Sequence, residues 1–343
     1  MVPQITIISC CKTTTGSDRN PVMKYWHCGL ATLLLGCGSA AAGTFDWTAE
    51  PLREVKIETV AFRGWVPDDS EPLRGTLILI PGRHGDGRGM AEDARWQRLA
   101  TTLRFAIIAC QFANGDTGIY QSDDKGEVAK AINAAVEHLA KESGHPELAK
   151  APLAFWGTSA GSNVSSRYCK HYPERVAAFA SSKGTWGPSG EITRSNTEIP
   201  MLFALGQNDK AEWVTTSMAN IEKGLKGQTP WAFALSPNEG HGVEGSLDVC
   251  IPFLEAAVKQ RLGEKGTGGS NSIFKSQLPS VGSQPTPGSS TGKLQKITLS
   301  AGWLGDPKTF EVAPYATFKG TKSKAVWLPD EATATAWQTY VRH

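Results

Sequence analysis

Residues 157–161 read Gly-Thr-Ser-Ala-Gly and match the pattern G-x-S-x-G. A serine hydroxyl is a weak nucleophile until a neighbouring base removes its proton. A tight turn from a strand into a helix lifts such a hydroxyl clear of the sheet, and small residues on both sides relieve the crowding. The same pattern recurs at 288–292, but there no strand precedes it and no helix follows it. We therefore predict that Ser159 is a catalytic nucleophile.

A serine in such a turn is followed along the chain first by an acid and then by a histidine base. His241 comes late in the sequence, after an apolar segment at 231–235, and glycines flank it on both sides. Flanking glycines suit a loop that brings an imidazole close to other backbone, so we predict His241 as the base. Other histidines fall in the leader, at the carboxyl terminus, or on and near predicted helices, where solvated roles are common: His27, His138, His145, His171 and His343.

The third member of such a group is a carboxylate that orients the imidazole and stabilises its charged form. Asp209 lies in the short segment that follows the predicted strand at 200–205. Glu239 and Glu244 are closer to His241 in sequence, but this geometry is built from different strands, so a short separation is no advantage. We predict Asp209 as the acid.

Attack on a carbonyl also requires two preorganised donors for the negative oxygen that forms. The N–H of Ala160, directly after the nucleophile, is one candidate. The other comes from the glycine-rich segment 81–89, where we favour the N–H of Arg83, with His84 beside it in contact with substrate. The alternatives are a glycine-rich turn without a role and a phosphate cradle, although the segment lacks the spacing of phosphate-binding loops.

Short apolar segments bounded by glycine or proline alternate with segments of helical period. This order predicts an α/β fold with a mostly parallel central sheet and helices on both faces. In such sheets ligands bind at the carboxyl ends of the strands, where the residues above are expected. Strands are predicted at 56–62, 75–80, 105–111, 152–156, 176–180, 200–205 and 231–235, and helices at 92–103, 128–139, 160–172, 212–225 and 247–262.

The chain divides into four parts by composition. Residues 1–43 form a leader, and 44–263 the α/β domain. Residues 264–293 are rich in Gly, Ser and Pro, which indicates a linker. Residues 294–343 regain aromatic side chains and are predicted as short strands ending in a helix from about Glu331. Because fifty residues make a small independent core, we expect this extension to pack on the α/β domain; a separate binding module is the alternative.

The leader has the parts of a secretory signal: a basic start at 23–24, a short apolar run and a small-residue end. Residues 34–37, Leu-Leu-Gly-Cys, resemble the bacterial lipobox, in which Cys37 would carry lipid. Cleavage after residues 40–42 and a cytosolic chain with a chance apolar patch are the alternatives. The expected location is secreted or periplasmic, with a lipid anchor as an option. In that compartment Cys110, Cys169 and Cys250 allow one disulfide and leave one free thiol, with the pairing open.

Composition excludes several functions. The formal net charge is +2 with 20% charged residues, and the basic residues are scattered, so neither nucleic acid nor an anionic membrane is expected as the main partner. A membrane would be reached only through the lipid anchor. No spacing of Cys and His suggests a metal, and we expect no cofactor. Oligomeric state is left open.

Taken together, the glycine-rich loop, GTSAG, GQND and EGHG motifs, each after a predicted strand, resemble the α/β-hydrolase superfamily over residues 55–262. The nearest resemblance is to dienelactone hydrolases, polyhydroxybutyrate depolymerases and feruloyl esterases. It implies an α/β-hydrolase fold and an esterase whose nucleophile, acid, base and oxyanion donors are the residues assigned above. Dienelactone hydrolases carry Cys where this chain has Ser159, so that particular activity is not expected.

The resemblance implies a serine hydrolase that cleaves small-molecule or polymeric carboxylic esters through an acyl-enzyme on Ser159. Trp186 follows the predicted strand 176–180 and could line the acyl pocket, because secreted polyester hydrolases carry a Trp at a similar place; plain packing is the alternative. A polyester depolymerase or feruloyl-type esterase is the alternative in the same class. A non-catalytic surface lipoprotein that binds through its Trp-rich carboxyl terminus is the alternative of another class.

Overall fold

The structure is a computed structural model, and it describes residues 43–68, 71–113, 123–184, 196–243, 245–264 and 293–343. Nearly all of the predicted linker and of the predicted leader, with Cys37, lie outside these ranges, as do Trp186 and Glu244. Within the described residues, no helix is both long and apolar enough to cross a membrane.

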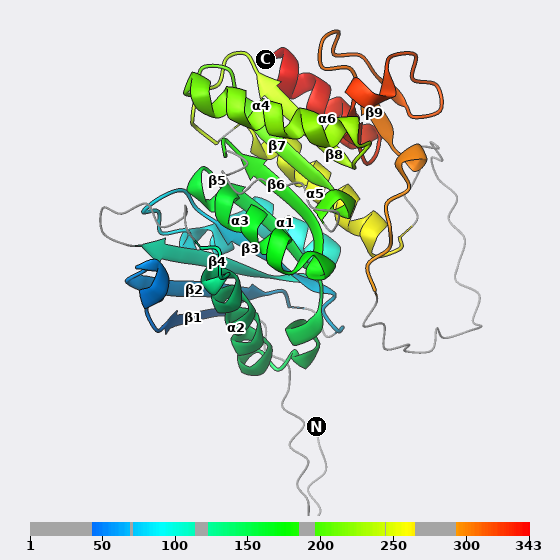
Figure 1. Cartoon of the computed structure of the whole chain (residues 1–343). Coiled ribbons are helices and arrows are strands. Elements are labelled where there is room, and N and C mark those ends of the chain that lie inside the picture. Colours follow the sequence, from blue (N-terminus) through cyan, green and yellow to red (C-terminus); the bar gives the residue numbers. More distant parts are fainter. Residues whose placement is uncertain (1–42, 69–70, 114–122, 185–195, 244, 265–292) are drawn as a thin grey trace, which may run out of the picture. The chain divides into compact units, whose positions relative to one another are not determined.

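An eight-stranded sheet with the order β1-β2-β4-β3-β5-β6-β7-β8 forms the centre of the fold (Figure 1). The strands from β3 onward run parallel, whereas β2 is antiparallel to both β1 and β4. The strands are β1 Gly43–Ala49, β2 Thr59–Val66, β3 Gly75–Ile80, β4 Phe105–Ala113, β5 Leu153–Thr158, β6 Val176–Ser182, β7 Met201–Gly206 and β8 Trp231–Ser236. The predicted α/β class with a mostly parallel sheet is confirmed.

Helices cover both faces of this sheet. Helices α1 and α5 pack against each other on one face, and α2 and α3 pack against each other on the opposite face (Figure 1). The strands between them are apolar at consecutive positions because both faces are covered; every residue of β3 and of β7 is buried. The helices are α1 Ala94–Leu103, α2 Glu127–Glu142, α3 Ala160–His171, α4 Ala211–Lys226, α5 Leu247–Arg261 and α6 Glu331–Arg342.

Two strands at the antiparallel edge differ from the sequence prediction. β1 was missed, although Phe45 and Trp47 alternate with more exposed polar residues in the period of a half-buried edge strand. The strand predicted at 56–62 begins later, because residues 53–55 form a short 3-10 helix and Lys56 closes it with a left-handed φ of 55°. The chain therefore enters β2 only at Thr59.

The carboxyl-terminal segment forms a small antiparallel sheet, β10-β9-β11, followed by α6. Its strands are β9 Trp303–Gly305, β10 Val312–Pro314 and β11 Val326–Leu328. Helix α6 begins at the predicted residue, and the Asp330 side chain caps it by accepting from the N–H of Thr333 at 2.8 Å. Helix α6 packs against α5 and β8, and β11 also contacts β8 (Figure 1).

Trp337 is the main apolar anchor of α6. Its side chain is fully buried, and its indole Nε1 donates to the carbonyl oxygen of Phe233 in β8 at 2.6 Å. Because β8 is the last strand of the sheet, this bond satisfies a carbonyl group at the sheet edge. The segment thus shares its core with the α/β domain.

Candidate active site

Ser159 lies at the turn between β5 and α3. Its backbone has φ 51° and ψ −120°, a conformation that L-residues rarely adopt and that often marks functional sites. The N–H of Ser159 donates to the carbonyl oxygen of Ser182 at the end of β6 at 3.0 Å, which fixes the turn to the neighbouring strand.

The two glycines of the motif are required by close approaches of backbone. A Cβ on Gly157 would lie 2.6 Å from the carbonyl carbon and oxygen of Gly161, and a Cβ on Gly161 would lie 2.3 Å from the carbonyl oxygen of Ile80. Neither neighbour is a flexible side chain, so any larger residue would displace backbone. The small residues therefore let α3 begin directly beneath the end of β3.

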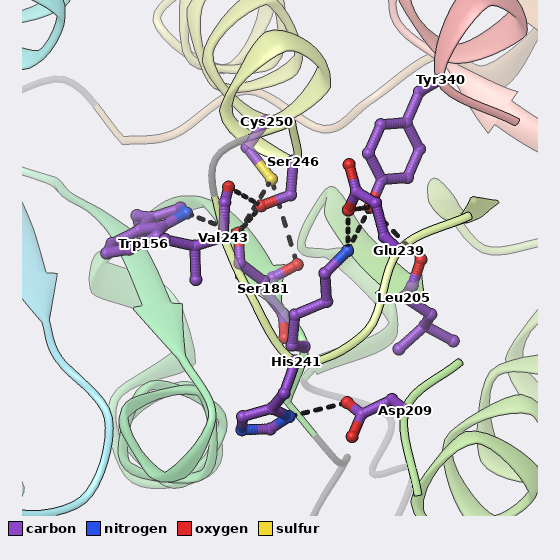
Figure 2. A network of polar contacts seen from close by, with 12 residues as sticks. Trp156, Ser181, Leu205, Asp209, Glu239, His241, Val243, Ser246, Cys250 and Tyr340 are labelled. Carbon is purple, nitrogen blue, oxygen red and sulfur yellow. Dashed lines mark hydrogen bonds and ion pairs between the residues drawn. The ribbon is translucent and has the colours of Figure 1, made fainter. Parts of the chain in front are cut away.

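The structure brings together Ser159, Asp209 and His241, which we call the triad. The Nε2 atom of His241 lies 2.9 Å from the Oγ atom of Ser159, and its Nδ1 atom lies 2.7 Å from Oδ2 of Asp209. These residues lie 82 and 32 positions from His241 in the chain, and each follows a different parallel strand. The contacts have the geometry of a nucleophile, a base and an orienting acid. Figure 2 shows the Asp209–His241 pair at the carboxyl end of the sheet.

The environments of the acid and the base differ. The Asp209 side chain is 7% exposed, and its second oxygen, Oδ1, accepts from the N–H of Lys210 at 2.7 Å. The His241 side chain is 41% exposed. The carboxylate is therefore held in place by two bonds, while the imidazole can reach both Ser159 and a bound molecule.

The predicted oxyanion donors come from two elements near Ser159. Ala160 is the first residue of α3, where backbone N–H groups have no partner within the helix. The loop after β3 passes close to the nucleophile, since a Cβ on Gly82 would lie 3.4 Å from Cβ of Ser159. Arg83 and His84 follow and are exposed, and His84 has a left-handed φ of 58° in a turn closed by a bond from Gly85 N–H to the Gly82 carbonyl.

Sequence reasoning missed Trp213 in the first turn of α4. Its ring centroid lies 5.1 Å from that of His241, and the Nζ atom of Lys210 lies 4.3 Å from the centroid of the Trp213 ring. The indole is half-buried and forms a wall beside the base. Its place four residues after Asp209 was the available signal, because residues that follow a parallel strand gather at the same edge.

Sequence reasoning also missed a second polar cluster beside the triad, formed by Lys183, Glu239 and Tyr340. Figure 2 shows two of its members, the carboxylate of Glu239 and the hydroxyl of Tyr340, next to each other. Glu239 was considered only as a rival to Asp209. In the structure its carboxylate contacts Lys183 and Tyr340, whereas Asp209 holds the imidazole.

Serine hydroxyls fix the far end of the loop that carries His241. Ser246 Oγ contacts the carbonyl oxygen of Val243 at 2.6 Å and Ser182 Oγ at 2.8 Å (Figure 2). Ser182 Oγ also accepts from the indole Nε1 of Trp156 at 3.0 Å. The loop is therefore tied to β5, which ends at the nucleophile turn, and to β6, which pairs with β5.

Cys110, Cys169 and Cys250 are all buried free thiols, so the single disulfide that an oxidising compartment would allow is not formed among them. Burial raises the pKa of all three thiols, and for Cys250 it does so to about 12. A thiol that stays protonated is a poor nucleophile, which indicates packing roles. In the described part of the chain, no three His, Cys, Asp or Glu side chains are grouped as a metal site would require.

No protein-family model and no curated protein sequence matches the chain. Among solved structures, it is similar to a ferulic acid esterase (13% identity, TM-score 0.48, covering 63% of this chain and 98% of the other). It is also similar to poly(aspartic acid) hydrolase-1 from Sphingomonas sp. KT-1 (15% identity, TM-score 0.47, covering 63% of this chain and 99% of the other). A third similar structure is the poly(3-hydroxybutyrate) depolymerase from Bordetella parapertussis (16% identity, TM-score 0.45, covering 63% of this chain and 89% of the other). These likenesses are distant, so any activity has to be argued from the site itself.

Proposed function

We propose that the protein is a serine hydrolase that cleaves carboxylic esters through an acyl-enzyme on Ser159. One observation carries the proposal: a single imidazole, that of His241, contacts both the hydroxyl of Ser159 and the carboxylate of Asp209. This arrangement activates an otherwise weak nucleophile and stabilises the imidazolium that forms when the proton is taken up.

In the proposed reaction, Nε2 of His241 removes the proton from Ser159 Oγ as the oxygen attacks the ester carbonyl. The tetrahedral oxyanion is stabilised by the N–H of Ala160 and that of Arg83, and the positive end of α3 points toward the same place. His241 then returns its proton to the departing alcohol, which leaves the acyl group on Ser159. A water molecule, deprotonated by His241, then attacks the acyl carbon. The bond to Ser159 Oγ breaks, the acid leaves, and His241 returns the proton to Oγ, which restores the serine.

The exposed neighbours of the triad support a substrate that enters from solvent. Arg83, His84 and Lys210 are exposed, and Trp213 offers an aromatic face beside His241. We propose that the Trp213 ring contacts the group attached to the scissile bond. Trp186, the sequence-based candidate for the acyl pocket, lies outside the described residues and stays a prediction.

The test is hydrolysis of p-nitrophenyl esters with acyl chains from two to twelve carbons, by wild type and Ser159→Ala side by side. We expect turnover by the wild type, loss of at least a thousandfold in the variant, and unchanged circular dichroism and melting temperature. A fluorophosphonate probe should label wild type at Ser159 only. Equal activity in both proteins, or labelling at another residue, would overturn the proposal.

A further inference from the structure

We propose that the buried Lys183 and Tyr340 and the half-buried Glu239 form a polar lock through which the carboxyl-terminal helix α6 positions the catalytic base. The inference rests on the proposed function, since it concerns the loop that carries His241. It makes Tyr340, 99 positions after His241, a positioning residue for the reaction.

Lys183 stands at the centre of the lock. It follows the last residue of β6, has a left-handed φ of 54°, and its side chain has no exposed surface. Its N–H donates to the carbonyl oxygen of Ala204 in β7 at 2.8 Å, which fixes its backbone to the next strand. The Nζ atom donates to the carboxylate of Glu239 and to the hydroxyl of Tyr340 (Figure 2).

Glu239 connects the lock to the base, because it lies two residues before His241. Its carbonyl oxygen accepts from the N–H of Asn208 at 2.9 Å, in the loop that carries Asp209. The backbone around it is tightly packed: a Cβ on Gly206 would lie 2.3 Å from that carbonyl oxygen. The start of the base loop is therefore held by the acid loop through its backbone and by the lock through its side chain.

Tyr340 brings α6 into this cluster. Its hydroxyl oxygen lies 2.7 Å from Oε2 of Glu239 and 3.2 Å from the carbonyl oxygen of Leu205, which is near the end of β7. The residue that follows α6 makes a second contact with the same loop, because the Nδ2 atom of Asn238 donates to the carbonyl oxygen of His343. Two successive residues of the base loop thus contact the end of α6.

Electrostatics couple the members of the lock. The Lys183 ammonium has no exposed surface and is costly without a charged partner, so it needs the carboxylate of Glu239, whose side chain is 26% exposed. The single proton of the Tyr340 hydroxyl goes to one acceptor at a time, while the oxygen accepts from Lys183. Without that hydroxyl, Lys183 loses a partner and Glu239 loses a contact, and the carboxylate is free to move with its loop.

A small displacement of a catalytic base lowers the reaction rate strongly. Proton transfer requires His241 Nε2 to stay within hydrogen-bond reach of Ser159 Oγ, and a misplacement of about 1 Å can cost on the order of a hundredfold. The lock contacts the loop and not the substrate, so its loss is expected to lower kcat and leave KM nearly unchanged. The carboxyl-terminal segment would then have two roles: α6 supports the position of His241 as well as the stability of the fold.

The test compares Tyr340→Phe with Tyr168→Phe. Tyr168 is a matched control, because it is also a buried tyrosine whose hydroxyl makes a hydrogen bond, to Asn133 Oδ1 at 2.6 Å, but on the side of α3 that faces α2. We expect Tyr340→Phe to lower kcat about tenfold or more, with KM within twofold. The rate of fluorophosphonate labelling should fall by a similar factor, and Tyr168→Phe should leave both rates within twofold.

A second pair covers the case in which Tyr340→Phe fails to fold. Glu239→Gln leaves the buried Lys183 ammonium without a carboxylate and should lower the melting temperature, whereas adding Lys183→Met should restore stability without restoring kcat. Full recovery of kcat in the double variant, or equal kcat losses in the two tyrosine variants, would overturn the lock. Absence of turnover and labelling in wild type would instead contradict the proposed function, so the two failures are distinguishable.

Discussion

The backbone N–H of Asn208 donates to the carbonyl oxygen of Glu239 at 2.9 Å, so the loop that carries Asp209 holds the loop that carries His241. Asp209 and His241 therefore keep their separation through the backbone as well as through the side-chain bond between them. Two neighbouring parallel strands, β7 and β8, start these loops at the same sheet edge. The pairing of β7 with β8 therefore helps to set the positions of Asp209 and His241 relative to each other.

Replacing Asp209 by Asn tests the orienting role of the acid. The amide keeps an oxygen for the N–H of Lys210, but it would turn an NH2 group toward Nδ1 of His241. The imidazole would then carry its proton on Nε2, where it cannot accept the proton of Ser159. We expect kcat for ester hydrolysis to fall by about a thousandfold to ten-thousandfold, with the melting temperature nearly unchanged.

Asp93→Asn is the control for this substitution. Asp93 caps α1 by accepting from the N–H of Arg95 at 2.8 Å, and Asn is an equally good cap. The control should retain wild-type kcat. A comparable kcat for Asp209→Asn and wild type would show that another group orients the base.

The strained backbone of Ser159 gives a prediction on stability. At φ 51° an alanine keeps the strain and a glycine relieves it, although glycine also raises the entropy of the unfolded chain. We expect Ser159→Gly to unfold with a free energy about 0.5–1 kcal/mol higher than Ser159→Ala, both being inactive. Urea titration of the two variants measures the difference, and a more stable alanine variant would contradict the presence of strain.

Much of the fold could be predicted from the sequence, because parallel strands buried on both faces read as continuous apolar runs. β3 was predicted with its exact bounds at Gly75–Ile80, and α6 with its first residue. The antiparallel edge was harder to read: β1 is only half-buried, and a local left-handed turn at Lys56 delays β2. Such turns depend on a single φ angle, which the hydrophobic pattern does not report.

Asp209 and His241 were predicted by one rule, that side chains just after parallel strands meet at the carboxyl end of the sheet. The same rule applied to Lys183, which follows β6 directly, but a lone lysine in a loop is usually solvated. Its partners are Glu239 and Tyr340, more than fifty and more than a hundred and fifty positions away. Sequence spacing holds no information on such long-range pairing, so the lock could be found only in the structure.

Gly161→Ala tests the close approach beneath the nucleophile. The added Cβ would meet the carbonyl oxygens of Ile80 and Pro81 at 2.3 and 2.4 Å, so the end of β3 has to move. We expect a loss of about 1–3 kcal/mol in the free energy of unfolding, together with a lower kcat, because the loop proposed to supply the Arg83 oxyanion donor begins there. Gly89→Ala is the control: nothing lies within 4 Å of its added Cβ, and it should behave as wild type.

The buried cysteines predict resistance to alkylation. Since burial raises the pKa of the Cys110, Cys169 and Cys250 thiols, almost no thiolate is present at pH 8.5. After iodoacetamide treatment of the native protein, peptides that contain these three residues should be unmodified, and after unfolding in guanidinium they should be alkylated. A disulfide-linked pair among them, or alkylation in the native state, would contradict the structure.

Buried tyrosines predict a fall in stability at alkaline pH. Burial raises the pKa of Tyr168 and of Tyr340 above the ordinary value of 10.0, so the native state keeps both phenols protonated. Above pH 10 the unfolded chain ionises these groups and the native chain does not, so the unfolded state binds fewer protons. The free energy of unfolding should then fall by about 1.4 kcal/mol per pH unit for each phenol. Below pH 10 both states keep the phenols protonated, so no stability is lost there.

Urea unfolding of wild type and Tyr168→Phe at pH 9, 10, 11 and 11.5 isolates one of these phenols, because every other group that titrates in this range is shared. The variant should lose stability at pH 9, where it lacks the hydrogen bond to Asn133, but its curve should fall less steeply above pH 10. The two curves are therefore expected to converge as the pH rises. Parallel curves would mean that Tyr168 ionises in the native protein at the same pH as in the unfolded chain.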